Sequence, residues 1–262
     1  MAKSKLIKKL VSNEISIIEA LDRLLLIAIE LNDVDTVEWI KNEKNGYYGN
    51  EIPDYRYTVA TPIGNYQIIT MGNLVQYNQR VLPTIGIPQN IKDEWSNYPV
   101  RESITILLEQ KKSYEKGKIS GIPIPMELYS MFEKGTNVEV TSAFLTISEF
   151  SIAKIIDNLK TKMLELLMLY EKNFGELDQF DVDVDEYNIE EMKKIFEIAH
   201  KIINENYKGD IYIINSKVKK SNIGDNNQIN KSSEVSLDLN INKEEKKGLL
   251  SKIKRLFNKK KS

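Results

Sequence analysis

Apolar residues recur at helical spacing along most of the first 206 residues. The clearest early stripe runs from Ile17 to Leu31, and Ser16 opens an S-x-x-E capping box in front of it. Leu26, Ile27 and Ile29 widen the apolar surface, so we expect this helix to be covered on two sides, by the fold or by a second copy of the chain. Further helices are predicted after Ser4 and over residues 35–44, 91–96, 103–116, 126–133, 151–173 and 189–206.

Residues 55–70 show a different pattern, in which β-branched and aromatic residues alternate. Pro62, Gly64 and Asn65 lie in the middle of this stretch, which predicts a β-hairpin that turns there. Residues 137–147 predict one more strand, and the prolines of residues 81–99 indicate an irregular connection. Together these patterns predict an α+β fold with a mainly helical body and a small antiparallel β element.

The composition changes after about residue 206. Residues 207–242 are rich in Asn, Ser, Asp and Lys, and the aliphatic residues Val235, Leu237, Leu239 and Ile241 alternate strictly near their end. This is typical of a β-prone, low-complexity segment. We therefore predict three parts, namely an α+β domain over 1–206, an Asn/Ser-rich β-prone segment over 207–242 and a basic amphipathic tail helix over 243–262.

The residue types narrow the possible chemistry. The 262 residues are 41% hydrophobic and 29% charged, as in an ordinary globular protein, with no cysteine and one histidine, His200. This composition excludes disulfides, thiol nucleophiles and thiolate metal sites, together with the usual zinc and Ser-His-Asp sites. His200 follows Ala199 on the flank of a predicted helix, where we expect a half-exposed surface histidine.

The sequence also lacks the common motifs for nucleotides and metal ions. Neither G-x-x-x-x-G-K-[ST] nor G-x-G-x-x-G occurs. An EF-hand loop starting at Asp181, in the acidic run from Asp178 to Glu186, would need glycine at Glu186 and glutamate at Met192. We interpret this run as a solvated linker, and we predict no cofactor and no metal site.

The N-terminal residues bear on location. Residues 1–9 are basic, but no long uncharged apolar stretch or small-residue cleavage site follows them, so we expect no signal peptide. No run reaches the roughly 18 apolar residues that a membrane-spanning helix needs. A cytoplasmic protein is therefore expected.

The formal net charge of −1 conceals an uneven distribution. Residues 243–262 carry nine Lys/Arg and two Glu, a net charge of +7, which leaves 28 basic and 36 acidic side chains in the rest of the chain, a net charge of −8. A basic tail on an acidic body indicates a contact with an anionic surface.

On a helix, the tail separates an apolar face from a basic face, as interfacial helices do. The candidate membrane-binding residues are Leu249, Leu250, Lys252, Ile253, Lys254, Arg255, Leu256, Phe257, Lys259, Lys260 and Lys261. We expect this tail to bind the anionic inner surface of the membrane reversibly, so that the protein becomes peripheral there. Docking on the acidic body of the same or a neighbouring chain is the second possibility. Nucleic acid is less favoured, because it selects polar stretches interleaved with aromatic residues.

One short segment carries a family resemblance. The strings W-x-x-x-E-x-x-G-Y and P-x-Y-R close the N-terminal helices and lead into the β element. Their residues are Glu38, Trp39, Glu43, Gly46, Tyr47, Pro53, Tyr55 and Arg56. With the order of elements over about residues 3–205, these strings resemble the AbiTii domain family of bacterial abortive-infection proteins. The resemblance implies a role in phage defence, with a toxic or growth-arresting domain, and it implies no catalytic mechanism.

Two interpretations of the motif residues remain open. Glu38, Glu43, Glu51 and Asp54 could supply carboxylates to a hydrolase or nuclease site near Arg56. Alternatively, Trp39 is a core anchor, Gly46 ends a helix, and Tyr47 and Arg56 join helix to strand by packing and hydrogen bonds.

The leading hypothesis is a growth-arresting effector that self-associates, as a homo-oligomer, and uses its tail at the membrane; enzymatic activity is less favoured and stays open. A sensor or adaptor that binds a phage or host protein is the third hypothesis.

Overall fold

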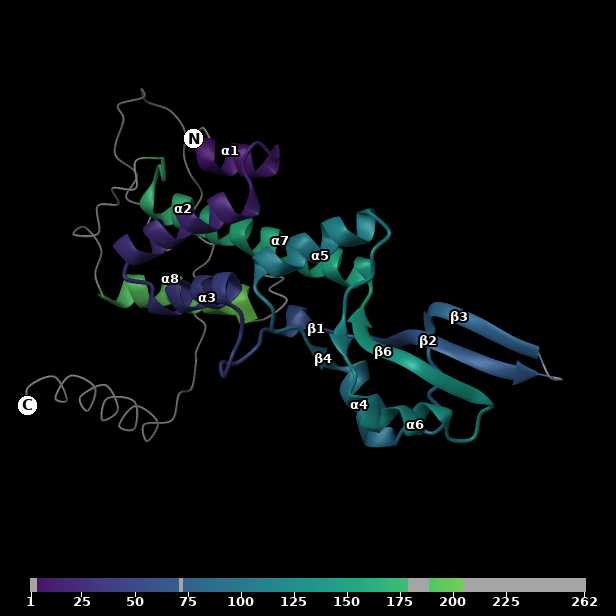
Figure 1. Ribbon diagram of the computed structural model, residues 1–262. Coiled ribbons are helices and arrows are strands. Elements are labelled where there is room, and N and C mark those ends of the chain that lie inside the picture. The colour runs from purple at the N-terminus through teal and green to yellow at the C-terminus, as the bar shows by residue number, and fades with distance from the viewer. Residues whose placement is uncertain (1–3, 71–72, 179–188, 205–262) are drawn as a thin grey trace, which may run out of the picture. The chain divides into compact units, whose positions relative to one another are not determined.

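The computed structural model describes residues 4–70, 73–178 and 189–204, and all of them belong to one compact unit of the chain. Within these ranges the protein is mainly helical with a small antiparallel sheet, which confirms the predicted α+β fold (Figure 1). The predicted segments over 207–242 and 243–262, with every candidate membrane-binding residue, lie outside the described residues. Most of the acidic run that starts at Asp178 also lies outside them.

The helical part is built around one long helix, α7 (Glu149–Phe174). It packs against α1 (Lys5–Val11), α2 (Ile17–Glu30), α5 (Ile104–Glu115) and α8 (Ile189–Asn204). The helix α3 (Val34–Asn45) packs against α2, α5 and α8. Periodic apolar residues from all of these helices form one core, as their spacing predicts.

The ends of these helices follow the capping chemistry of the sequence. Ser16 accepts a hydrogen bond from the backbone N–H of Glu19 at 3.1 Å, so the predicted N-cap of α2 is present. A carboxylate from the segment after α7 binds the first N–H groups of α1. Asp178 accepts the N–H groups of Lys5 at 3.0 Å and Leu6 at 3.2 Å. These contacts tie α1 to the segment after α7.

The sheet has the strand order β3-β2-β6-β5, and every pair in it is antiparallel. Its strands are β2 (Ala60–Thr70), β3 (Asn73–Val81), β5 (Ile122–Pro123) and β6 (Val138–Ile147). The helices α4 (Gln89–Ser96) and α6 (Tyr129–Glu133) pack against it and share a second, smaller core with it (Figure 1). A separate two-stranded pair, β1 (Tyr57–Thr58) with β4 (Tyr98–Pro99), joins the two parts. Two 3₁₀ turns, η1 (Asp54–Arg56) and η2 (Met126–Leu128), complete the elements.

The hairpin predicted within residues 55–70 is wrong. After η1 and β1, this stretch continues without a turn as one strand, β2, which pairs with the unpredicted strand β3. A Cβ on Gly64 would lie 2.0 Å from the carbonyl oxygen of Ser142, so the glycine permits close approach of β6 and does not form a turn. Asn65 accepts the N–H of Gln79 at 2.8 Å at a bulge. The residues that suggest a turn therefore serve irregular strand pairing.

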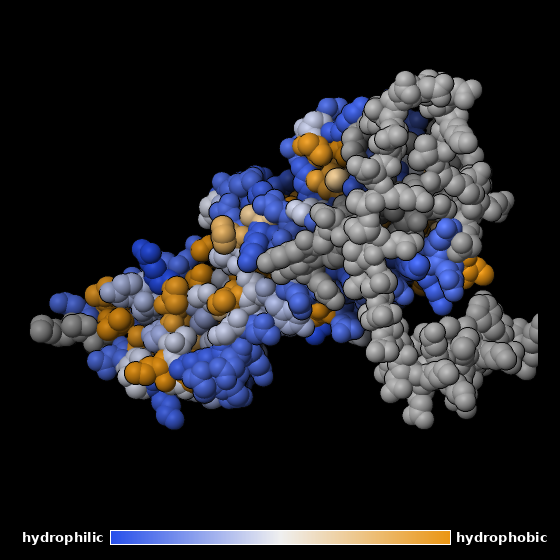
Figure 2. All heavy atoms as spheres, turned by 180° about the vertical axis from the view of Figure 1, so that it is seen from behind, coloured by the Kyte–Doolittle hydropathy of each residue, from blue (hydrophilic) through white to orange (hydrophobic). Residues whose placement is uncertain are grey.

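The prediction that α2 is covered on two sides is met only in part by the fold. Ile27 is fully buried, whereas Leu26 and Ile29 are about half exposed at 51% and 49%. A second apolar surface lies on the open face of the sheet, where Pro123, Phe144, Ile63 and Val81 are aligned across four strands. Figure 2 shows exposed apolar side chains, in orange, on the part of the molecule that carries the sheet.

Among the described helices, none is long and apolar enough to cross a membrane.

Candidate functional site

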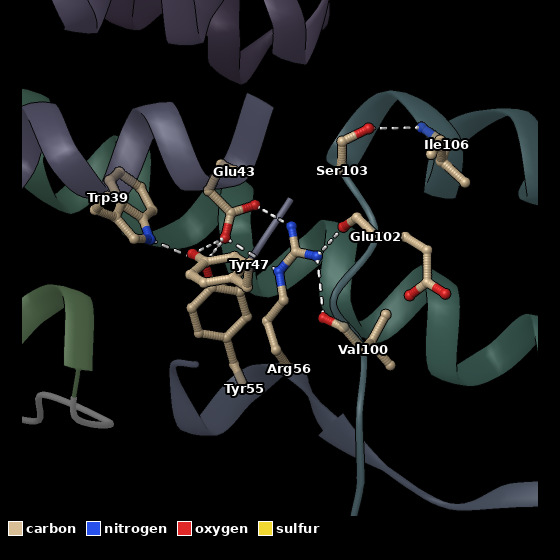
Figure 3. Close-up of polar contacts among 9 residues, drawn as sticks. All are labelled: Trp39, Glu43, Tyr47, Tyr55, Arg56, Val100, Glu102, Ser103 and Ile106. Carbon is tan, nitrogen blue, oxygen red and sulfur yellow. Dashed lines mark hydrogen bonds and ion pairs between the residues drawn. The ribbon is translucent and has the colours of Figure 1, made fainter. Parts of the chain in front are cut away.

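The motif residues come together where α3 meets the start of the β element. The helix α3 supplies Trp39 and Glu43, the segment after it supplies Tyr47, and η1 supplies Tyr55 and Arg56 (Figure 3). We call these five residues the Glu43 cluster. All of them are buried.

The chain reverses at Gly46 to bring the cluster together. Gly46 ends α3 with a φ of 94°, and its N–H donates to the carbonyl of Asn42 at 2.8 Å, which confirms its predicted role at the helix end. A Cβ here would lie 2.8 Å from the carbonyl oxygen of Arg101. That close approach lets the N–H of Tyr47 donate to the same carbonyl at 2.8 Å, and Nη1 of Arg101 donates to the carbonyl of Tyr47 at 3.0 Å.

Glu43 lies at the centre of the cluster, and its carboxylate accepts four hydrogen bonds. Its Oε1 accepts the hydroxyl of Tyr47 at 2.6 Å, the hydroxyl of Tyr55 and Nε of Arg56 at 3.1 Å. Its Oε2 accepts Nη2 of Arg56, which completes a bidentate ion pair. Trp39 extends the network, because its indole Nε1 donates to the hydroxyl of Tyr55 at 3.0 Å.

Arg56 links this carboxylate to the segment before α5. Its Nη1 donates to the carbonyl of Glu102 at 2.6 Å and more weakly to that of Val100 at 3.4 Å. Its guanidinium carbon lies 5.0 Å from the centroid of the Tyr47 ring. Burial opposes the charged form, but the Glu43 carboxylate holds the pKa of Arg56 above its ordinary value. Arg56 is therefore charged across the physiological pH range.

The two tyrosines donate from protonated hydroxyls. Burial, reinforced by the charge of Glu43, raises the pKa of Tyr47 and of Tyr55 well above the ordinary value. Neither ring is available as a proton acceptor near neutral pH. The hydrogen bonds and the ion pair make the Glu43 cluster a rigid joint between α3, η1 and the segment before α5.

The cluster leaves no place for a substrate at Glu43. Both partners of the Glu43–Arg56 ion pair are 0% exposed, and both carboxylate oxygens are occupied. A general base must reach the proton it abstracts, and Glu43 cannot do so in this arrangement. Of the other candidate carboxylates, Glu38, Glu51 and Asp54 are exposed, and none of them joins the cluster. Tyr47 and Arg56 instead join helix α3 to the segment that follows it by packing and hydrogen bonds, as in the second interpretation of the motif.

A pocket of about 330 Å³ lies beside the cluster. Helix α3, residues 47–53 and the end of α8 line it, and we call it the α3–α8 pocket. Trp39, Tyr47 and Pro53 of the family motif contribute to its wall, as does Glu38. The motif therefore shapes a hollow on the surface as well as a buried joint.

His200 lies in this pocket and has a partner that the sequence did not reveal. Its Nδ1 is 3.2 Å from Oδ2 of Asp35, and both side chains are more than half exposed. The amide of Asn204, one turn further along α8, lies 3.2 Å from Nε2. The half-exposed position matches the expectation. The partner was missed because it lies on α3, and only the packing of α3 on α8 brings the two together.

The described residues hold no group of three or more His, Asp or Glu side chains placed to bind a metal ion.

Of three comparisons with known proteins, one gave a match, and it agrees with the family motif. A search of curated proteins and a search of solved structures each found no match. The AbiTii family model matches residues 4–195, which include the whole Glu43 cluster and most of the described fold. The chain therefore belongs to the AbiTii family.

Proposed function

We propose that this protein is a growth-arresting effector of abortive infection that self-associates and acts at an anionic membrane through its basic tail. Membership of the AbiTii family suggests an abortive-infection defence protein. The observation that carries the finer mechanism is the sequence of residues 249–261, where apolar residues at helical spacing oppose a row of Lys and Arg.

The charge of the tail is sufficient for reversible membrane binding. Each Lys or Arg near an anionic leaflet contributes roughly 1 kcal/mol, and residues 243–262 carry a net charge of +7. Five large apolar residues on the opposite face add burial in the headgroup region. Several tails on one oligomer would bind more tightly than one, because the second contact is intramolecular.

Exposed apolar residues support self-association. Leu26 and Ile29 on α2 are about half exposed, and Phe144 and Val81 are 41% and 59% exposed on the open face of the sheet. Contiguous apolar surface of this kind is typical of protein contacts. The sealed Glu43 cluster favours such a mechanism over hydrolysis at the motif, since its central carboxylate contacts no solvent.

Vesicle flotation tests the membrane step. The full chain is compared with a version that ends at Asn242 and with one whose tail has the same composition in scrambled order, on anionic and on neutral vesicles. We expect only the full chain to float strongly, and only with anionic vesicles. Equal flotation of the scrambled tail would show that charge alone acts and that the amphipathic face has no role.

Growth during phage infection tests the effector step. The same three proteins are expressed at equal levels, and survival of the infected culture and of individual cells is measured. We expect the two altered tails to lose growth arrest while their bodies remain folded. Equal arrest by all three proteins would refute the membrane mechanism. Light scattering of the full chain and of Leu26→Ser/Ile29→Ser measures self-association directly.

A further inference from the structure

The strand β3 forms one edge of the sheet. Among the strands that the structure describes, only β2 pairs with it, and all nine of its residues are exposed (Figure 1). Edge strands are commonly protected from further pairing by shortness, proline or charged side chains. The opposite edge strand, β5, has two such protections, since it has two residues and one of them is Pro123. In contrast, β3 has no proline, and Arg80 is its one charged residue.

One side of the β3 backbone faces away from β2. The N–H of Asn65 donates to the hydroxyl of Ser142 on β6 at 3.2 Å, so the next residue of β2, Tyr66, directs its backbone groups toward β3. Tyr77 lies opposite Tyr66, and its backbone groups therefore face β2. The residues that alternate with these inward positions direct N–H and C=O outward, and they are Leu74, Gln76 and Asn78.

Two rows of apolar side chains cross the sheet and end at β3. The rows are Val140–Tyr66–Tyr77 and Val138–Ile68–Val75. The rings of Tyr66 and Tyr77 stack with their centroids 5.0 Å apart. Tyr66 packs against the second core, whereas Val75 and Tyr77 at the ends of the rows are 43% and 37% exposed. The rows are therefore open at the same edge where backbone groups face outward.

A second copy of β3 matches this edge in one antiparallel register. With a two-fold axis at Gln76, Val75 of each copy lies opposite Tyr77 of the other, so both apolar rows continue through two molecules. An axis at Val75 would instead place Tyr77 opposite Asn73, and an axis at Tyr77 would place Val75 opposite Gln79. Gln79 also has a positive φ of 52°, at the bulge where regular pairing ends.

The other face of the same strands is polar and also self-complementary. Gln76 lies opposite Gln67, whose side-chain amide donates to Oε2 of Glu139 at 2.5 Å. At a two-fold axis, Gln76 meets Gln76 of the second copy, and a glutamine amide has both donors and an acceptor. Two such amides can bond to each other, which two side chains of the same charge cannot.

We infer that two copies of this chain join through β3, edge to edge, and form one antiparallel sheet that runs through both molecules. An interface of this kind is isologous, because the same surface of each copy supplies both halves. Main-chain hydrogen bonds supply the attraction, and the matched rows of side chains set the register. The inference assigns a surface to the self-association in the proposed function and rests on it.

Cysteine cross-linking tests the register in the full chain. The sequence has no cysteine, so an introduced cysteine is the only thiol. In the dimer Gln76 lies directly opposite its own counterpart, with Cα atoms about 5.5 Å apart, which suits a disulfide. Gln76→Cys should therefore form a disulfide-linked dimer on mild oxidation, measured by gel electrophoresis without reductant. Asn78→Cys is the matched control on the same exposed strand. Its counterpart lies four residues further along, roughly 13 Å away, and it should cross-link at least tenfold more slowly.

A proline variant tests the backbone hydrogen bonds. Gln76→Pro removes an N–H that faces outward, so it leaves the pairing of β3 with β2 in place. Gln76→Ala changes the same side chain and keeps the N–H. Analytical ultracentrifugation of the full chain should show that proline raises the dimer dissociation constant at least tenfold and that alanine raises it less than threefold. Circular dichroism and thermal unfolding check that both variants are folded.

Failure of this inference and failure of the proposed self-association give different results. Equal cross-linking at positions 76 and 78, or a folded Gln76→Pro protein that associates as tightly as the unaltered chain, would overturn pairing through β3 and leave self-association to another surface. A full chain that stays monomeric, with no cross-link at position 76, would overturn both. That second result is the one expected if a segment of the same chain covers the edge.

Discussion

Replacing Glu43 by glutamine should destabilise this protein more than any comparable exposed change. The substitution keeps the size of the side chain and removes its charge, so Arg56 becomes an unpaired cation at a site where both partners are 0% exposed. Four hydrogen bonds to the carboxylate are also altered. Breaking a buried pair by removing one partner typically costs about 3 to 5 kcal/mol, because the remaining charge is desolvated without compensation.

That loss is large beside the roughly 5 to 15 kcal/mol by which domains of this kind are stable. Urea unfolding followed by circular dichroism measures it. Glu38→Gln is the matched control, since it makes the same chemical change on the same helix at an exposed position, and it should alter stability by less than about 0.5 kcal/mol.

A double-mutant cycle identifies the cause of the loss. Arg56→Met removes the cation, and Glu43→Gln/Arg56→Met leaves no buried charge at all. We expect the double variant to be destabilised by less than the sum of the two single changes, with a coupling of about 1 to 3 kcal/mol. A loss below about 1 kcal/mol for Glu43→Gln, or strict additivity, would refute the account of the cluster as a charged joint.

Three further changes test other parts of the fold by the same unfolding assay. Gly64→Ala should cost about 1 to 3 kcal/mol or more, because its Cβ would lie 2.0 Å from the carbonyl oxygen of Ser142; a neutral result would contradict the close approach of β2 and β6. Burial raises the pKa of Asp33, so the native state keeps its proton longer, and stability should fall as pH rises through the ordinary and then the folded pKa. Asp33→Asn, which preserves the N-cap, should remove that fall, and an unchanged pH profile would count against it. Burial raises the pKa of Asp178 as well, but hydrogen bonds from two N–H groups of α1 outweigh it and lower the pKa of Asp178, so its contribution is present above the ordinary pKa and lost as pH falls through the folded one; Asp178→Asn should remove this acid-side loss, and an unaltered acid limb of the profile would refute it.

The helices were predictable because each carries its own signals. A stripe of apolar residues and a local cap identify α2, and a glycine with positive φ identifies the end of α3. The strand β3 was not predictable in the same way. All of its residues are exposed, so the alternation of buried and exposed positions that identifies a strand is absent. Pro62 and Gly64 added a false turn signal, since both residue types also occur at bulges and close approaches.

In the candidate site, too, contacts between residues near in sequence could be predicted and contacts between distant residues could not. Trp39 to Arg56 are near one another in sequence, so their likeness to a family motif and their joining role could be inferred. The full set of contacts around Arg56 could not be inferred, because the carbonyls that hold its Nη1 lie 44 and 46 residues away. Asp35 and His200 are further apart still, and only the packing of α3 against α8 brings them into one pocket.

Three parts of the protein could each be needed for the proposed growth arrest, and a loss of arrest alone would not show which part a mutation affects. The Glu43 cluster is a buried joint, the side chains of Glu38 and Glu51 line a pocket, and the basic tail lies at the other end of the sequence. If the cluster is only a joint, the proposed growth arrest should fall in the Glu43→Gln protein in proportion to the folded fraction and recover at lower temperature, where the fold is restored. Loss of arrest by a fully folded Glu43→Gln protein would instead assign the buried carboxylate a direct part in function, which its burial and its four accepted hydrogen bonds argue against.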